Sequence, residues 1–482
     1  SIKLLKLLSI IVHIKLIGVI MLKSKWILFF IFSFFYQSIH SSSYEAESVG
    51  MSYERLQKIT PTISDLYLKT GKFPGFITAI ARKGKVVHYE TIGFADLETR
   101  ESLKKDSLFR IYSMSKPITG VALMILMEQG KVRLNDPVSL YIPEFSDTKV
   151  LVIGEDGSTN LVEQKKKMTL RDLATHTSGI AYDFTANEQL AQIYREKNLS
   201  PYFPINNADN LTQEDLARGM IDASKPFKDI CAFAETLAKE APLMHQPGEN
   251  YTYSMGMDVL GCVIERVSGQ RFDAFLKDNI FIPLKMNDTF FTIPESKKGR
   301  FTSLYADIRD LRQYFPELNE TLPKELKMLK IDSKQKSPYF EEATVLDGGS
   351  GLVSSTEDYL KFSQMLLNGG KLGDERIISR KSVELMSGNH LPDTFSSDAY
   401  LETAGGYRSG AGIGLTVGVL TDPAKAGQYG SRGMFFWGGA ASTIFWIDPK
   451  EELVAVLMTQ VLGSSELLRE TYSALVYQAI DD

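Results

Sequence analysis

Ser113 and Lys116 are the residues whose types and spacing most directly allow catalysis. They stand three positions apart at the start of a segment with apolar residues at helical spacing. Residues three apart on a helix share one face, so the lysine nitrogen can approach the serine oxygen. A serine hydroxyl is a weak nucleophile that needs a nearby base, and a helix N-terminus favours a developing alkoxide. The spacing predicts a nucleophilic serine, although taken alone it also fits a capping serine beside a solvated lysine.

Other common catalytic patterns are absent from the sequence. The six histidines are scattered and form no HExxH motif, no CxxC occurs, and the glycine-rich phosphate-binding patterns are missing. Ser350 comes nearest to a GxSxG elbow, but Leu352 stands in place of its second glycine. We therefore expect no metal, no cofactor and no α/β-hydrolase.

The segment around Ser113 resembles a known nucleophile segment. Leu108–Ile118 (LFRIYSMSKPI) is similar to that of the serine β-lactamase and penicillin-binding-protein superfamily, in particular its class C β-lactamases and family VIII esterases. Four further segments match that branch in order: Leu173–Gly179, Gln246–Gly248 with Tyr253–Met255, Asp347–Leu352, and Trp437–Gly439. The resemblance runs from about residue 50 to about residue 480 and implies a β-lactamase/transpeptidase-like fold.

The resemblance implies that Tyr253 acts together with Lys116 as the general base. The chemistry is reasonable, because a lysine ammonium stabilises a nearby phenolate. Taken without the resemblance, Tyr253 would be read as a core aromatic residue. Met255 stands where class C β-lactamases carry asparagine. The change removes an amide that could bind an acylamino group, and it favours ester substrates.

The resemblance also implies a strand-borne triplet beside the nucleophile, formed here by Trp437, Gly438 and Gly439. β-Lactamases carry Lys-Thr-Gly or a near variant in this place. The N–H groups of Ser113 and Ala440 would form the oxyanion hole, where two backbone donors stabilise a tetrahedral oxygen. Trp437 places an uncharged ring where a cation would hold a substrate carboxylate. An ordinary sheet aromatic followed by turn glycines would also explain the triplet.

Other residues of these segments have expected places as well. Tyr182 is expected to form a wall of the acyl pocket, and residues 183–245 could cover the site. His176 lies in a recurrent structural segment and no third residue completes a triad around it, so we expect a structural role. Lys69–Gly71 spells Lys-Thr-Gly literally, but it precedes Ser113 and ends an expected helix, which indicates a helix C-cap.

Strand-like runs lie near both ends of the chain and helix-like runs lie between them. We expect a hairpin over 76–94, strands over 412–420, 434–437, 442–447 and 453–459, and helices over 52–70 with a kink at Pro61, 118–126, 258–267, 272–277 and 465–480. Residues 296–340 are charged and irregular and suggest a surface insertion. The predicted fold class is α+β: an antiparallel sheet formed from both chain ends and flanked by helices, with an inserted, mostly helical subdomain.

Residues 1–43 are expected to be a leader. Met21, two lysines, an apolar run over 26–36 and small polar residues indicate a signal peptide over 21–43. Residues 1–20 are interpreted as an upstream translation artefact, and a membrane anchor over 1–36 is the alternative.

The remainder, 44–482, is predicted to be a single catalytic domain, with an α/β part at 44–108 and 345–482 and a helical part at 109–344. In an oxidising compartment Cys231 and Cys262 could pair, although two buried thiols are the favoured interpretation.

The net charge of the chain limits the partners that it can be expected to bind. A net charge of −5 offers no basic excess to bind a phosphate backbone, so nucleic-acid partners are not expected. We predict a periplasmic or secreted serine hydrolase, without stable membrane association after leader cleavage, that acts on a small-molecule carboxylic ester. The alternatives are a β-lactamase or D-Ala-D-Ala-type peptidase, and a catalytically silent penicillin-recognising binding module.

Overall fold

The structure is a computed structural model that describes residues 45–199, 227–308, 327–391, 410–463 and 466–482. The expected leader lies outside these residues. Among the residues described, no helix is long and apolar enough to cross a membrane.

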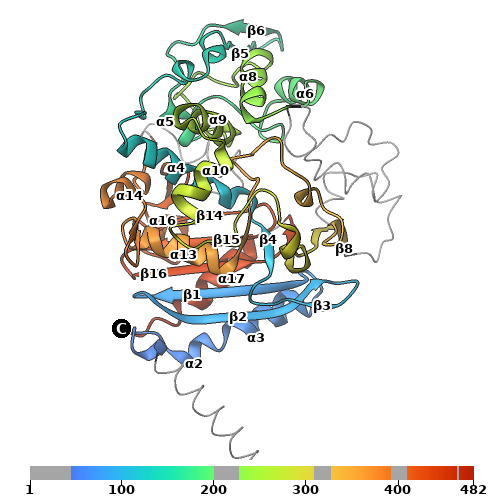
Figure 1. Cartoon of the computed structure of the whole chain (residues 1–482), viewed down its shortest axis with the longest axis vertical. Coiled ribbons are helices and arrows are strands. Elements are labelled where there is room, and N and C mark those ends of the chain that lie inside the picture. Colours follow the sequence, from blue (N-terminus) through green and yellow to red (C-terminus); the bar gives the residue numbers. More distant parts are fainter. Residues whose placement is uncertain (1–44, 200–226, 309–326, 392–409, 464–465) are drawn as a thin grey trace, which may run out of the picture.

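An eight-stranded antiparallel sheet forms the centre of the fold, in the order β12-β13-β14-β15-β16-β1-β2-β3 (Figure 1). Strand β1 pairs with β16, from Ile77 opposite Met458 to Arg82 opposite Leu453. The two ends of the chain therefore build one sheet, which confirms the predicted α+β class. The strands are β1 Gly75–Arg82, β2 Lys85–Asp96, β3 Glu101–Ser102, β12 Ala411–Ile413, β13 Gly418–Leu420, β14 Phe435–Gly438, β15 Ile444–Asp448 and β16 Leu453–Met458.

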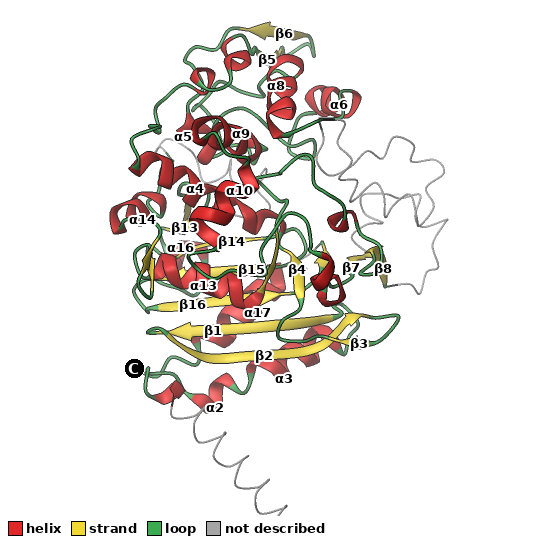
Figure 2. Ribbon diagram, in the orientation of Figure 1, coloured by secondary structure: helices red, strands yellow, loops and turns green. Residues whose placement is uncertain are grey.

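Helices cover both faces of this sheet (Figure 2). Side chains alternate between the faces of a strand. The even-numbered residues of β16 belong to one core cluster and its odd-numbered residues to another. Helix α13 (Thr356–Leu367) packs across β1, β15 and β16 on the first face. Helices α2 (Tyr53–Leu56), α3 (Ile59–Ile63) and α17 (Glu466–Tyr477) supply the second core cluster on the other face.

The mostly helical part lies beyond α13, in the upper half of Figure 1. Its central helix, α4 (Lys116–Glu128), is buried from Lys116 to Leu126 and packs against α9 (Gly256–Ser268). A helix that is apolar on all sides in this way belongs in a core. The other described α-helices of this part are α5 Leu170–Ala174, α6 Glu188–Glu196, α8 Ile230–Glu240 and α10 Phe272–Leu276; α14 Arg380–Met386 and α16 Pro423–Ala426 come later, in the α/β part. The smaller sheets are formed by β4 Leu108–Arg110 with β9 Val353–Ser355, β5 Val150–Ile153 with β6 Thr159–Val162, β10 Lys371–Leu372 with β11 Glu375–Arg376, and β17 Val461–Leu462 with β7 Leu304–Asp307 and β8 Met328–Asp332.

The expected surface insertion over 296–340 is wrong for its described parts. Strands β7 and β8 pair with β17, and Asp332 of β8 forms a fully buried ion pair with Arg110 of β4. The guanidinium of Arg110 also donates to the carbonyl of Thr302 at 2.7 Å. At least one charge of this segment, that of Asp332, is therefore paired inside the protein, where an unpaired charge would be costly. A charge-rich composition alone does not distinguish a solvated loop from such an internal network.

The favoured interpretation of two buried thiols is also wrong. Cys231 on α8 and Cys262 on α9 form a disulfide, with their Cα atoms 4.8 Å apart. Sequence distance could not show this, because the pairing depends on how α8 packs against α9. The bond ties together two helices of the helical part.

Candidate active site

Ser113 lies in a 3₁₀ turn, Tyr112–Ser115, that follows β4 and precedes α4. The expected position at the start of the α-helix is therefore corrected: the helix proper begins at Lys116, with Pro117 in its first turn, where proline is well tolerated. The backbone N–H of Lys116, which caps this turn, donates to the Ser113 carbonyl three residues back, and this 3₁₀-type bond brings the two residues close to eclipsed. Tyr112, just before the serine, has a φ of 42°, an uncommon conformation for a bulky residue. Strain of this kind gathers at functional sites.

The side chains of Ser113, Lys116 and Tyr253 meet. Ser113 Oγ lies 2.6 Å from the Tyr253 hydroxyl, and Lys116 Nζ donates to Ser113 Oγ at 3.1 Å. Lys116 Nζ is also 4.7 Å from the centroid of the Tyr253 ring. The structure thus gives the serine two close polar partners, as the proposed acid–base roles require.

Lys116 is fully buried and donates to two further acceptors. These are the Gly349 carbonyl at 2.9 Å and the Tyr182 hydroxyl at 3.1 Å. A lysine ammonium has three N–H donors, and Ser113, Gly349 and Tyr182 supply three acceptors. Tyr182, which is expected to form a wall of the acyl pocket, is 1% exposed and contacts Lys116. Its place in the acyl pocket stays a prediction. Sequence reasoning missed both lysine contacts, although Gly349 belongs to one of the matched segments.

Ser115 has a different environment from Ser113. It is fully buried, and its Oγ accepts the N–H of Leu352 at 3.2 Å, whereas Ser113 is partly exposed. The neighbouring serine therefore serves the packing of the 3₁₀ turn, and Ser113 alone of the two faces the lysine.

Aromatic side chains pack around Tyr253. Its ring centroid lies 5.2 Å from Tyr182, 4.9 Å from His176 and 6.0 Å from Trp437. Trp437, on β14, is 3% exposed and stacks at 13° on the imidazole of His176. These uncharged rings pack against the ring of Tyr253, and the expected contact of Trp437 with substrate stays a prediction.

The glycines of the triplet allow the β14–β15 hairpin to approach the nucleophile turn. A Cβ atom on Gly439 would lie 2.4 Å from the carbonyl oxygen of Ile111, and one on Gly438 would lie 2.5 Å from Arg469. The contact with a backbone oxygen gives glycine a steric reason at 439, whereas at 438 the nearest atom is the end of a flexible side chain. Ala440 is exposed, and its amide donates no hydrogen bond within the described part of the chain. The oxyanion-hole role that the resemblance implies for this N–H stays a prediction.

Met255 is fully buried at the N-terminus of α9 and packs in the main core cluster. The structure therefore gives this thioether no exposed surface, and its expected contact with substrate stays a prediction. What the position does show is that no side-chain amide stands two residues after Tyr253.

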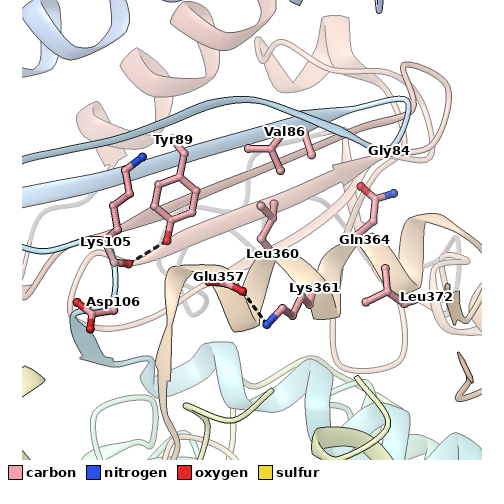
Figure 3. A pocket seen from close by; sticks show the side chains of 11 residues that line it. Gly84, Val86, Tyr89, Lys105, Asp106, Glu357, Leu360, Lys361, Gln364 and Leu372 are labelled. Carbon is pink, nitrogen blue, oxygen red and sulfur yellow. Dashed lines mark hydrogen bonds and ion pairs between the residues drawn. The ribbon is translucent and has the colours of Figure 1, made fainter. Parts of the chain in front are cut away.

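A cavity of about 560 Å³ lies elsewhere, between the β1–β2 hairpin and α13 (Figure 3). Tyr89, Val86 and Leu360 line it, and the Tyr89 hydroxyl donates to the Lys105 carbonyl at 3.0 Å. None of its lining residues belongs to the group around Ser113. Within the described residues, His, Cys, Asp and Glu side chains form no cluster of three that could hold a metal ion.

Comparison with known proteins adds the family context. Residues 62–478 match a family model described as Beta-lactamase. The esterase EstB of Burkholderia gladioli is 28% identical over 411 residues, which span 82% of this chain and 88% of that protein. The acyltransferase mokF of Monascus pilosus is 27% identical over 331 residues, or 66% and 67% of the two chains. The solved structure of EstCE1, a hydrolase with promiscuous acyltransferase activity, superposes with a TM-score of 0.66 at 24% identity, covering 88% and 99%.

Proposed function

The chain belongs to the β-lactamase family and is a serine hydrolase, and on this premise we propose that it cleaves carboxylic esters through an acyl-enzyme on Ser113. The observation that carries the proposal is the position of Ser113 Oγ, 2.6 Å from the Tyr253 hydroxyl and 3.1 Å from Lys116 Nζ. A nucleophile within hydrogen-bond reach of its base is the geometry that covalent catalysis requires.

In the acylation step, Ser113 Oγ attacks the ester carbonyl carbon while its proton passes to the oxygen of Tyr253. Tyr253 accepts this proton in its phenolate form, which the charge of Lys116, held against the Tyr253 ring, stabilises. The carbonyl oxygen becomes an oxyanion that the N–H groups of Ser113 and Ala440 stabilise. When the tetrahedral intermediate collapses, the C–O bond to the alcohol breaks and the alcohol takes the proton from Tyr253.

Deacylation reverses these roles with water. A water molecule gives a proton to Tyr253 and attacks the acyl carbon, and the oxyanion forms in the same place. Collapse then breaks the bond to Ser113 Oγ, which recovers the proton and leaves the carboxylic acid. Each bond that breaks is matched by one that forms, and the cycle needs no cofactor.

Two features favour neutral esters over β-lactams. Trp437 presents an indole where a carboxylate-binding cation would stand, and Met255 replaces an amide-bearing residue. A carboxylate that loses water without gaining a partner is strongly destabilised. The alkyl group of a short ester instead gains from contact with the indole ring.

The deciding experiment compares purified protein on p-nitrophenyl acetate, p-nitrophenyl butyrate and the chromogenic cephalosporin nitrocefin. We expect kcat/KM for the better ester to exceed that for nitrocefin by about 100-fold or more, given the several kcal/mol that an unpaired carboxylate loses. Equal efficiency on nitrocefin would favour the β-lactamase alternative. Absence of turnover on all three, with nitrocefin bound, would favour a silent binding module.

Labelling with a fluorophosphonate probe tests the nucleophile itself. The wild type should be labelled, Ser113→Ala should not, and Ser115→Ala is the matched control because its hydroxyl lies two residues away but faces Leu352. Labelling that persists in Ser113→Ala would overturn the mechanism.

We also propose a periplasmic or secreted location. The Cys231–Cys262 disulfide supports it, since such bonds persist in oxidising compartments. Cell fractionation that finds the protein in the cytosol, with both cysteines reduced, would contradict this location.

A further inference from the structure

The two residues that flank Tyr253 both donate hydrogen bonds to His176. The N–H of Thr252 donates to the His176 carbonyl at 2.8 Å, and the N–H of Ser254 donates to its Nδ1 at 3.2 Å. His176 thus holds the chain on either side of the tyrosine. Its ring centroid also lies 4.9 Å from that of Tyr253.

These contacts fix the tautomer of His176. The backbone N–H of Ser254 can only donate, so Nδ1 must carry the lone pair and the ring proton lies on Nε2. The Ser254 hydroxyl lies 3.1 Å from Nδ1 and accepts the N–H of Gly256 at 3.2 Å. Its own proton can therefore be directed to Nδ1 as well. Through Ser254, the imidazole also holds the first turn of α9.

The ring stays neutral and leaves one polar atom without a partner. Burial, with a smaller contribution from the Lys116 charge, holds the pKa of His176 well below its usual value of 6.5. Nε2 is buried and bonds to none of the described residues. A buried unpaired donor costs stability, and in native structures such groups call for a functional explanation. The backbone of His176 adds to this cost with a φ of 58°.

We propose that His176 is a positioning residue that holds the Tyr253 hydroxyl at Ser113 through the acceptor atom Nδ1. The inference rests on the proposed function, in which Tyr253 moves the proton. His176 is fully buried, so its proposed role acts through Tyr253 and not through contact with the substrate. The proposal goes beyond the expected structural role, because the two hydrogen bonds that His176 accepts come from the neighbours of a reacting group.

A pair of amide variants tests this role. His176→Asn places an amide oxygen near the position of Nδ1, and asparagine tolerates the left-handed backbone. His176→Gln carries the same amide one carbon further out, near the position of Nε2. The two variants match in polarity and differ in where the acceptor lies.

We expect His176→Asn to keep kcat on p-nitrophenyl butyrate within about threefold of wild type, and His176→Gln to lose about tenfold or more with KM little changed. A misplaced catalytic group can cost this much. Thermal unfolding of each variant establishes that it is folded at the assay temperature. If Gln does not fold, His176→Ala serves as the variant that lacks the acceptor.

The rate of fluorophosphonate labelling separates the inference from the function on which it rests. The probe reports the reactivity of Ser113 whatever the natural substrate is. Labelling should be slower in His176→Gln or His176→Ala than in the wild type, and unchanged in His176→Asn. Equal kcat and equal labelling rates in folded Asn and Gln variants would overturn the positioning role. A wild type that is not labelled at Ser113 would instead overturn the proposed function.

Discussion

The ammonium of Lys116 donates a hydrogen bond to the hydroxyl of Tyr182 over 3.1 Å. Both groups are buried, and Tyr182 stands 66 residues after the lysine. Thr185 links Tyr182 to Tyr253. Its hydroxyl donates to the carbonyl of Tyr253 at 2.8 Å and accepts the N–H of Tyr182 at 2.9 Å. Tyr182 therefore helps to hold the lysine charge in place.

Tyr182→Phe should lower kcat by about tenfold, because one donor of a buried ammonium then loses its acceptor. The ring, which lies 5.4 Å from Nζ, remains in the variant, so KM should change little. Steady-state kinetics on p-nitrophenyl butyrate measures both constants. Tyr141→Phe is the matched control, since its hydroxyl bonds Asp136 away from this group. An unchanged kcat in Tyr182→Phe would show that two acceptors suffice for Lys116.

Lys116 and Tyr253 are expected to act as one unit. Each of Lys116→Ala and Tyr253→Phe should lower kcat by about 100-fold or more, which is the usual contribution of general acid–base catalysis. The double variant should be little worse than the worse single variant, because residues that share one proton transfer are not additive. A double-mutant cycle on kcat provides the test, and losses that multiply would mean that the two residues act independently.

Most of the central sheet and the reacting group could be predicted from the sequence, whereas 412–420, expected as one strand, forms the two antiparallel strands β12 and β13. The runs that became β1, β2, β15 and β16 are apolar and bounded by turns, so their strands follow from local pattern. The three-residue spacing of Ser113 and Lys116 suggested a nucleophile, and the resemblance of the surrounding segment made the assignment. Tyr253 followed from the resemblance, because its contact with Ser113 spans 140 residues.

What could not be predicted depends on packing between distant segments. The carbonyl of Gly349 reaches Lys116 across 233 residues, and a backbone oxygen leaves no trace in residue type. The pairing of Cys231 with Cys262 depends on the approach of two helices. The ion pair of Arg110 with Asp332 lies inside the protein, whereas the charged composition of residues 296–340 had indicated an exposed segment.

The Cys231–Cys262 disulfide should stabilise the protein. It closes a loop between positions 31 residues apart, for which the loss of chain entropy in the unfolded state corresponds to about 3 to 4 kcal/mol. Replacing both cysteines by alanine should lower the free energy of unfolding by this amount in urea titrations. Wild type treated with a reductant should match the variant. If the reductant leaves the urea midpoint unchanged, the two cysteines do not pair in solution.

His88 should make the protein less stable in acid. Burial, and to a lesser extent the charge of Lys105, lowers the pKa of His88 from 6.5 to about 4. Its Nε2 lies 2.8 Å from Thr78 Oγ1 inside the β1–β2 pair. Between pH 6.5 and pH 4 the unfolded chain binds more protons at this site than the folded chain does. Acidification through this window therefore favours unfolding, by up to about 3 kcal/mol.

Urea titrations at pH 7 and pH 4.5 measure this loss. His88→Gln cannot titrate and keeps a polar end near Thr78, so its free energy of unfolding should fall less between the two pH values. A wild type and a variant with the same pH dependence would show that His88 is protonated in the folded protein without cost.

Trp437 should determine the preference for esters over β-lactams. Its ring is buried and stacks on the imidazole of His176, so this side chain offers a substrate carboxylate no counter-charge. Trp437→Lys supplies that charge, and in a poorly hydrated site an ammonium attracts a carboxylate strongly. The ratio of kcat/KM for p-nitrophenyl butyrate to that for nitrocefin should fall by about tenfold or more, equivalent to about 1.4 kcal/mol.

Trp437→Phe is the control for this change. Phenylalanine keeps an apolar ring but is smaller than tryptophan, so the ratio should stay close to that of the wild type if charge, rather than size, is decisive. Thermal unfolding establishes that both variants are folded, which matters because lysine enters a position that is 3% exposed. A similar fall in both variants would mean that the volume of the indole excludes β-lactams. A ratio unchanged in folded Trp437→Lys would mean that the carboxylate binds elsewhere, and the selectivity would then have to be sought outside β14.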